Sequence, residues 1–370
     1  MAQSPPSDSA TAGSEDAWTV RRLLDWIRKY LGEKEVESPR VCSELLLGHV
    51  LGCERLQLYM TPDREPSEGE LAQLRALVGR AASHEPVQYL VGSWPFHGRE
   101  FEVSPCTLIP RPATEMLVDS ALDEVKSKGI HREWSVLDLC TGSGCISVSL
   151  LATLQAARNG PLSERVNARQ PEEHPISIES DVVADEVEFD LELQPVPASM
   201  ENPSHQVEEA SLEGIDAVHG DVRLVATDID SEVVDLAKRN AIRHGVDSLI
   251  DLRIGSLWEP LVDEERSAFD IICANPPYVS DSEYLDLDRN VRDFEPARAL
   301  RGGPDGLDLV RPIIHGAPDW LRPGGLLLLE VGAHSAAQAL KEAKSNDRFQ
   351  FAEIREDYEG FPRMLVARIG

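Results

Sequence analysis

The stretch Asp138-Leu139-Cys140-Thr141-Gly142-Ser143-Gly144 decides the fold of this chain. It ends the short apolar run 135–139 and opens an apolar segment, so it predicts a strand, a tight loop and a helix. Glycines at 142 and 144 let the backbone turn sharply and approach a ligand closely. A helix N-terminus directs backbone N–H groups at an electronegative group. Two glycines alone are weak support for a ligand site, so the surrounding segments carry the argument.

The sequence after this loop alternates strand-like and helix-like segments. Further apolar runs of strand length occupy 222–227, 249–254, 270–274, 326–331, 349–354 and 364–369. Helices are expected at 231–244 and 334–344. This alternation predicts an α/β fold with a doubly wound, mostly parallel, Rossmann-like sheet. The last two strands are close in sequence, and we expect them to pair as an antiparallel edge hairpin.

The sequence before the loop predicts three further segments. Residues 1–17 are mostly Ser, Pro, Ala and acid and read as a disordered tail. Apolar residues at helical spacing begin a small helical domain over 18–85, in which Ser38-Pro39 is expected to cap the second helix. Residues 86–112 are rich in Gly, Pro and aromatics and predict a hairpin linker. The sheet domain then spans 113–370.

The chain has 370 residues and a formal net charge of −29, which opposes binding to nucleic-acid backbones and anionic membranes. Residues 160–221 contain 16 acids, 2 Arg and six prolines and predict a mobile acidic surface insert, alternatively a docking arm. The six cysteines form no metal-binding or disulfide pattern, so no metal is expected. No apolar run is long enough to span a membrane, and no secretory signal is recognisable, so we expect a cytoplasmic protein.

Asp228 ends the strand that follows the insert, where a carboxylate can accept hydrogen bonds from both hydroxyls of a ribose. The third glycine of the dinucleotide fingerprint is missing, because Ser147 occupies its place. No pyrophosphate therefore needs to be held. A nucleoside that carries a carboxylate, such as S-adenosylmethionine, fits this pattern better than a dinucleotide.

A second motif, Asn275-Pro276-Pro277-Tyr278, directly follows the predicted strand 270–274. Two successive prolines fix the backbone and remove two N–H donors. The turn then presents carbonyl oxygens, one amide side chain and one aromatic face. This set suits a planar NH2 group, whose hydrogens the Asn275 oxygen and the Pro276 carbonyl can accept while Tyr278 packs against its π plane.

Together the two motifs resemble those of class I S-adenosylmethionine-dependent amino methyltransferases. Further segments narrow the resemblance to the release-factor glutamine methyltransferases of the HemK/PrmC family. They are Gln88-Tyr89-Leu90-Val91-Gly92, Ile109-Pro110-Arg111-Pro112-Ala113-Thr114-Glu115, Val291-Arg292-Asp293-Phe294-Glu295-Pro296 and Gly302-Gly303-Pro304-Asp305-Gly306-Leu307. The resemblance covers residues 18–370 except the insert and includes the small helical domain.

The resemblance implies specific roles. Cys140, Thr141, Gly142, Ser143 and Gly144 form the cofactor loop, Asp228 binds the ribose of S-adenosylmethionine, and Leu257 lies at the adenine. Asn275, Pro276, Pro277 and Tyr278 form the catalytic, substrate-binding turn, in which Asn275 also contacts the cofactor. This sequence departs from the family at Cys140, where Gly is usual, and at Ser256 and Leu257, where an acid and an aromatic are frequent. Trp258 is a candidate replacement for the aromatic.

The implied reaction is transfer of a methyl group to the side-chain amide of the glutamine in the Gly-Gly-Gln motif of peptide release factors, with the helical domain docking the substrate. The alternatives are another protein glutamine, a nucleic-acid base, or a cofactor-binding module without activity. The net charge and the lack of any basic, aromatic-laced segment oppose a nucleic-acid substrate. For Arg111 and Glu115 we expect an inter-domain ion pair. The alternative is that they position the substrate.

Overall fold

The computed structural model describes residues 17–129, 132–158 and 222–370. The chain divides into two compact units, with the boundary between Val91 and Gly92. The predicted acidic insert at 160–221 and all but the last residue of the predicted tail lie outside the described residues.

The first unit is helical. Its helices are α1 (Val20–Glu33), α2 (Pro39–Leu51), α3 (Arg55–Met60), α4 (Glu68–Ala81) and α5 (Val87–Val91). The apolar residues at helical spacing in α1 are all buried in one apolar cluster with α2, α4 and α5; they are Val20, Leu23, Leu24, Ile27 and Leu31. The predicted Ser38 cap is wrong in its chemistry, because Ser38 adopts a left-handed conformation (φ 46°) and its side chain makes no capping hydrogen bond. Pro39 does begin the helix, as its fixed φ favours.

No basic, aromatic-laced segment is recognisable in the sequence alone, but the outer face of α1 is one. Trp26 and Tyr30 stack with ring centroids 5.2 Å apart, and Trp18 meets Trp26 edge to face at 6.0 Å. The guanidinium of Arg22 lies over Trp18 and the ammonium of Lys34 over Tyr30. This helix and its flanking residues therefore form a basic, aromatic segment. Its aromatic and basic residues are four positions apart in the sequence, so they come together only when the helix forms.

The second unit is built on a seven-stranded sheet in the order β5-β4-β3-β6-β7-β9-β8. Its strands are β3 (Trp134–Leu139), β4 (Val222–Asp228), β5 (Ile250–Ile254), β6 (Phe269–Ala274), β7 (Leu321–Glu330), β8 (Phe349–Glu356) and β9 (Pro362–Ile369). Pairing is parallel from β5 to β7, whereas β9 runs antiparallel to both β7 and β8. The predicted α/β class, the doubly wound sheet and the antiparallel edge are confirmed.

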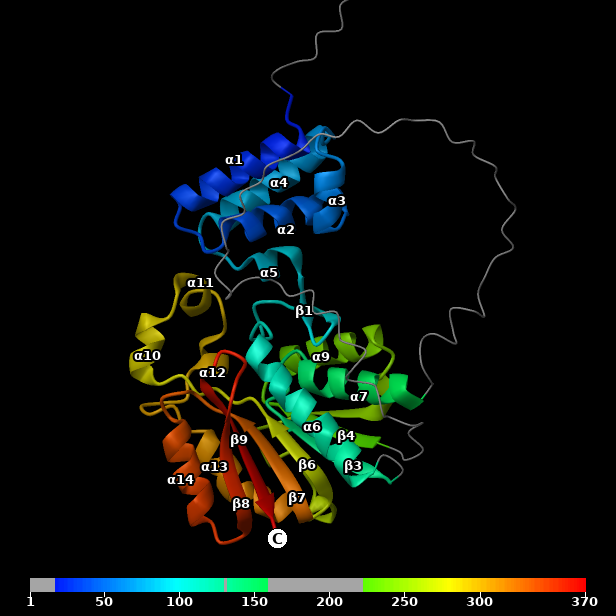
Figure 1. Ribbon diagram of the computed structural model, residues 1–370, viewed down its shortest axis with the longest axis vertical. Coiled ribbons are helices and arrows are strands. Elements are labelled where there is room, and N and C mark those ends of the chain that lie inside the picture. Colours follow the sequence, from blue (N-terminus) through cyan, green and yellow to red (C-terminus); the bar gives the residue numbers. More distant parts are fainter. Residues whose placement is uncertain (1–16, 130–131, 159–221) are drawn as a thin grey trace, which may run out of the picture. The chain divides into compact units, whose positions relative to one another are not determined.

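Helices cover both faces of this sheet, as Figure 1 shows. On one face lie α6 (Glu115–Lys128), α7 (Cys145–Arg158) and α9 (Ser231–Arg243), and on the other α13 (Val310–Trp320) and α14 (Ala336–Ser345). Alternate strand residues enter the two cores: Val136 and Ile271 join the first, and Leu137 and Ile272 the second. Every residue of β3 and β6 is buried, as expected for central parallel strands.

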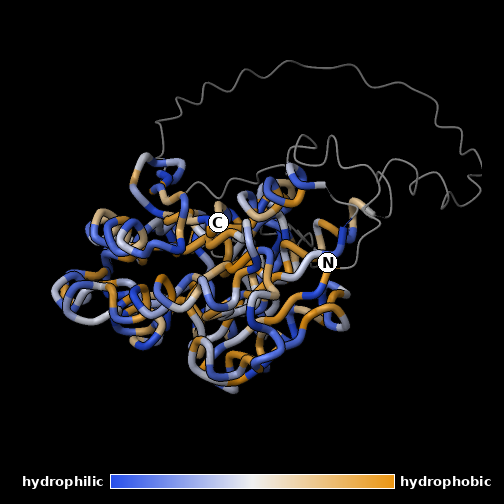
Figure 2. Tube along the Cα trace, turned by 90° about the horizontal axis from the view of Figure 1, so that it is seen from below, coloured by the Kyte–Doolittle hydropathy of each residue, from blue (hydrophilic) through white to orange (hydrophobic). Residues whose placement is uncertain are grey.

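The remaining elements are short. They are the hairpin β1 (Ser93–Phe96) and β2 (Arg99–Glu102), the 3-10 turns η1 (Pro112–Thr114), η3 (Asp247–Leu249) and η4 (Asp263–Glu265), and α10 (Asp281–Asp286), α11 (Arg289–Arg292) and α12 (Ala297–Leu300). Along the chain, hydrophobic and hydrophilic residues alternate over short stretches, as expected of elements with one buried face (Figure 2). Among the described residues, no helix is long and apolar enough to cross a membrane.

Candidate active site

Strand register brings the predicted site segments to one edge of the sheet. Leu139 pairs with both Thr227 and Ala274, so the loop after β3 lies between the residues that follow β4 and β6. Ala274 also pairs with Leu329, which places Glu330 beside the start of the Asn275 turn. The carboxyl ends of parallel strands are where ligands of such sheets bind.

The loop after β3 is connected directly to Asp228. The Gly142 N–H donates to Asp228 Oδ2 at 3.1 Å, and the Asp230 N–H donates to Oδ1 at 3.2 Å. Gly142 and Gly144 have positive φ angles of 56° and 78°. Cys140 also has a positive φ, of 58°, although it carries a side chain. Burial raises the pKa of Asp228, and the backbone donors oppose that shift. The structure thus joins two of the predicted cofactor segments.

Asp138 belongs to the predicted loop motif, although the sequence alone assigned it no role. Its carboxylate is fully buried, and Oδ2 accepts hydrogen bonds from Thr141 Oγ1 at 2.7 Å and Ser147 Oγ at 2.6 Å. Burial raises its pKa to about 6. The available signal was the pair of hydroxyl residues three and nine positions later, which the loop folds back onto the carboxylate.

The segment after β5 lies next to Asp228, because the Gly255 N–H donates to the Asp228 carbonyl at 2.9 Å. Leu257 is partly buried against the apolar cluster below α13 and has a positive φ of 46°. Trp258, the candidate replacement for the aromatic residue, packs against α13. Its indole stacks on Trp320, and its N–H donates to the Pro312 carbonyl at 3.3 Å, so it is packing material for α13.

Hydrogen bonds fix both polar side chains of the Asn275–Tyr278 turn. Asn275 Nδ2 donates to Thr114 Oγ1 at 3.1 Å, which leaves Oδ1 as the accepting atom of the amide. The Tyr278 hydroxyl donates to Glu330 Oε1 at 2.9 Å. Burial raises the pKa of both Tyr278 and Glu330. Pro276 and Pro277 are buried between these anchors.

The glycine loop, residues 302–306, packs against the backbone of the same turn. A Cβ on Gly302 would lie 2.8 Å from the Pro277 carbonyl oxygen, and one on Gly306 would overlap the Tyr278 carbonyl oxygen. The Gly302 N–H donates to the Val279 carbonyl at 2.8 Å. These contacts explain why small residues are needed at 302 and 306 in this segment.

Arg111 and Glu115 do not form the inter-domain ion pair that we expected. Arg111 Nη2 donates to the buried Glu295 at 2.5 Å, and the other oxygen of Glu295 accepts from the Ile109 N–H at 3.1 Å. Glu115 accepts from the His97 N–H at 2.7 Å. All of these residues belong to the second unit, where they tie the segment before α6 to the segment after the Asn275 turn.

Buried polar atoms without a protein partner concentrate at this edge. Within the described ranges they include Asp138 Oδ1, Ser143 Oγ, Thr227 Oγ1 and Glu330 Oε2. Such atoms are rare in protein interiors, and a bound polar ligand is one explanation for several of them at one place. Acceptors and hydroxyls next to glycines of positive φ fit a small polar nucleoside. In the part of the chain that the structure describes, no group of three or more His, Cys, Asp or Glu is arranged to hold a metal.

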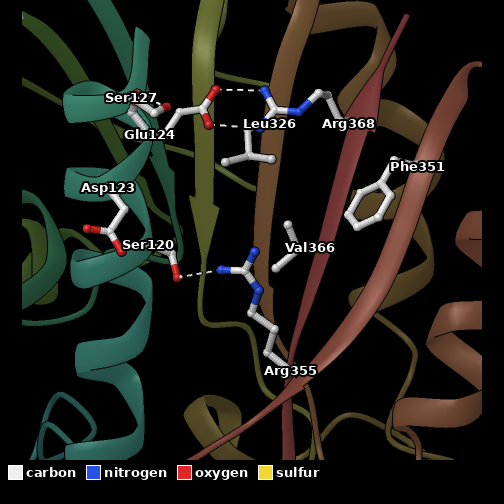
Figure 3. A pocket seen from close by; sticks show the side chains of 9 residues that line it. All are labelled: Ser120, Asp123, Glu124, Ser127, Leu326, Phe351, Arg355, Val366 and Arg368. Atoms are coloured by element: carbon white, nitrogen blue, oxygen red, sulfur yellow. Dashed lines mark hydrogen bonds and ion pairs between the residues drawn. The ribbon is translucent and has the colours of Figure 1, made fainter. Parts of the chain in front are cut away.

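A separate hollow of about 260 Å³ lies between α6 and strands β7, β9 and β8 (Figure 3). The Glu124–Arg368 ion pair crosses it with two hydrogen bonds of 2.6 and 2.8 Å, and Ser120 and Arg355 approach each other from opposite walls. None of the predicted site residues lines it. The polar groups that meet across this hollow are already paired with each other, so the carboxyl ends of the parallel strands remain the candidate site.

Comparison with known proteins is consistent with both units. The family model described as the PrmC N-terminal domain matches residues 22–92, and the model described as the RMKL-like methyltransferase domain matches residues 125–283. A release factor glutamine methyltransferase of Geobacter sulfurreducens is 34% identical over 96% of this chain and 98% of its own length. The chain belongs to the release factor glutamine methyltransferase family.

Other members show the same near-complete coverage. The release factor glutamine methyltransferase of Rhodopirellula baltica is 30% identical over 96% of this chain and 98% of its own length. That of Nitratidesulfovibrio vulgaris is 32% identical over 95% of both chains. As a member of this family, the protein is a protein glutamine methyltransferase, and S-adenosylmethionine is its methyl donor.

Proposed function

We propose that this enzyme transfers a methyl group to the side-chain amide nitrogen of the glutamine in the Gly-Gly-Gln motif of a peptide release factor. The observation that carries the proposal is the Asn275–Tyr278 turn, whose amide is fixed with its oxygen free to accept a hydrogen bond. The near-full-length relatives, which are named for this reaction, support the substrate class. We further propose that the enzyme acts in the cytoplasm, with a release factor as its partner and no direct nucleic-acid contact.

We assign cofactor binding to the loop and its neighbours. The backbone of Cys140, Thr141, Gly142, Ser143 and Gly144 would border the methionine part, since its glycines permit close approach. Asp228 would accept hydrogen bonds from the ribose hydroxyls, because each of its oxygens accepts one backbone N–H and keeps a second lone pair. Leu257 would offer apolar contact to the adenine. S-adenosylmethionine supplies an electrophilic methyl group when bound.

The turn would act by positioning the substrate. An amide nitrogen is a weak nucleophile, because its lone pair is delocalised into the carbonyl. Asn275 Oδ1 and the Pro276 carbonyl accept the two N–H hydrogens of the glutamine, and Tyr278 packs against its plane. Correct alignment of two reactants can contribute about 7–11 kcal/mol. The same two oxygens stabilise positive charge that develops on the amide nitrogen during transfer.

The reaction is tested by methyl transfer from labelled S-adenosylmethionine to a purified release factor. The matched control is the same release factor with its Gly-Gly-Gln glutamine changed to alanine. We expect label on the first protein and none on the second. Equal labelling of both would exclude the proposed residue. No label on either, with cofactor binding confirmed by calorimetry, would exclude the substrate class.

The rival substrate is a nucleic acid, and the basic, aromatic face of α1 is the feature that favours it. Stacked aromatic rings with interleaved cations are typical of single-strand binding. The net charge of −29 opposes that reading. Binding to single-stranded RNA that falls steeply with salt and is lost in Trp26→Ala would support the rival. We expect no such binding at physiological salt.

A further inference from the structure

The orientation of the Asn275 amide depends on one neighbouring hydroxyl. The oxygen and nitrogen of an Asn side chain are nearly equal in size, so packing alone does not decide which of them faces a substrate. Here Nδ2 donates to Thr114 Oγ1 at 3.1 Å. Thr114 is 1% exposed and ends the 3-10 turn before α6, so its side chain is buried beside the turn. If the amide were reversed, a donor would replace the acceptor at the substrate.

The position of the Tyr278 ring depends on a second buried group. The Tyr278 hydroxyl donates to Glu330 Oε1 at 2.9 Å, and Glu330 is completely buried at the end of β7. Because β7 pairs in register with β6, this anchor lies on the strand next to the one that launches the turn. A tyrosine ring that is pinned at its hydroxyl cannot swing away from the backbone of the turn.

We propose that Thr114 and Glu330 are positioning residues for the methyl transfer: Thr114 sets the direction of the Asn275 amide, and Glu330 holds the Tyr278 ring. This inference rests on the proposed function of the turn. Neither residue needs to touch the cofactor or the substrate. Their loss should therefore lower turnover without an equal loss of binding.

The Thr114 half is tested with Thr114→Val, which keeps the shape but removes the hydroxyl, and with Thr114→Ser, which restores the hydroxyl. Each variant is assayed for transfer to a release factor that the unaltered enzyme has been shown to methylate, so failure of the proposed function is detected first. We expect kcat to fall about 10- to 100-fold in Thr114→Val, with KM for the release factor and calorimetric Kd for S-adenosylmethionine within about threefold. Thr114→Ser should recover kcat to within about threefold of the unaltered enzyme.

The Glu330 half uses the same assays. Glu330→Leu removes the acceptor, Glu330→Gln keeps an oxygen for Tyr278, and Tyr278→Phe removes the same bond from its other end. We expect Glu330→Leu and Tyr278→Phe to lower kcat by similar factors. Glu330→Gln should keep kcat within about threefold of the unaltered enzyme. The double variant Glu330→Leu/Tyr278→Phe should have a kcat no lower than that of either single variant.

Two results would overturn the inference. One is unchanged kcat in Thr114→Val, or a Thr114→Ser variant as impaired as Thr114→Val. The other is full activity in Tyr278→Phe, because Glu330 would then not act through that hydroxyl. Tyr278→Phe keeps the ring and the backbone turn, so it tests the second half even if Glu330→Leu fails to fold.

Discussion

The loop at 140–144 and the turn at 275–278 follow neighbouring strands, yet they are held in different ways. Carboxylates hold the loop. Asp138 accepts hydrogen bonds from Thr141 in the loop and from Ser147 in α7, and Asp228 accepts one from the loop backbone. Uncharged backbone contacts and single hydrogen bonds hold the turn, with Thr114 and Glu330 as the side-chain anchors. The loop is thus arranged to bind a polar cofactor, whereas the turn is arranged to orient a neutral amide. Changes in the two regions should therefore affect different measurable quantities.

The largest effect is expected on the backbone of the turn. In Gly306→Ala, the added Cβ overlaps the Tyr278 carbonyl oxygen, and the residue would also have to keep a φ of 75°. A displacement of about 1 Å at a reacting group can cost on the order of 100-fold in rate, so we expect kcat to fall by at least that factor. Cofactor Kd should change by less than about threefold.

The control for this substitution is Gly79→Ala in α4, where nothing lies within 4 Å of the added Cβ. It should leave kcat unchanged. If Gly306→Ala kept full activity, the glycine loop would not support the turn.

A smaller effect, on a different quantity, is expected from the loop side. Asp228→Asn keeps one accepting oxygen but removes the charge and one of two acceptors for a diol. Hydrogen bonds to charged groups contribute about 1.5–3 kcal/mol, so Kd for S-adenosylmethionine should rise about 10- to 100-fold in calorimetry. At saturating cofactor, kcat should recover.

The matched control is Asp251→Asn on the adjacent strand β5, where the carboxylate is half-exposed and paired with Arg253. Its Kd should equal that of the unaltered enzyme. A Kd that is unchanged in Asp228→Asn would remove Asp228 from the cofactor site.

Asp138 makes the loop side dependent on pH. Burial raises its pKa to about 6 in the folded chain, so its ionised form destabilises the fold above that pH, and this cost disappears as the pH falls toward 4. A shift of this size corresponds to on the order of 3 kcal/mol at most. Asp138→Asn, without cofactor, should therefore have a higher Tm than the unaltered protein at pH 7.5 and an equal Tm near pH 4. A constant Tm difference across that range would contradict this assignment.

The smallest effect concerns Cys140, which has a φ of 58° in a position where a side chain is unfavourable. A left-handed residue costs about 1–2 kcal/mol, so Cys140→Gly should raise the free energy of unfolding by about 1 kcal/mol in urea denaturation. Cys140→Ala removes the thiol but keeps Cβ, and it should give no gain. Equal stabilisation by both would point to the thiol instead of the backbone.

The sequence predicted the sheet and the two motifs because both are local: an apolar strand followed by glycines or prolines defines them within a few residues. The anchors of the turn were not predictable in this way. Thr114 lies 161 residues from Asn275 along the chain, and Glu330 lies 52 residues from Tyr278. Strand register brings Glu330 to the turn, whereas Thr114 comes from the 3-10 turn before α6. The packing of Trp258 was not predictable for the same reason, since α13 contacts it from a distant segment.

The central claim is that the turn performs the chemistry and the loop holds the cofactor. Asn275→Ala tests it most directly, in a single-turnover assay with saturating S-adenosylmethionine and release factor, beside calorimetric cofactor binding on the same preparation. The account predicts a rate about 100- to 1,000-fold lower, with cofactor Kd within about threefold. An equal loss of rate and of cofactor affinity, or an unchanged rate, would contradict it.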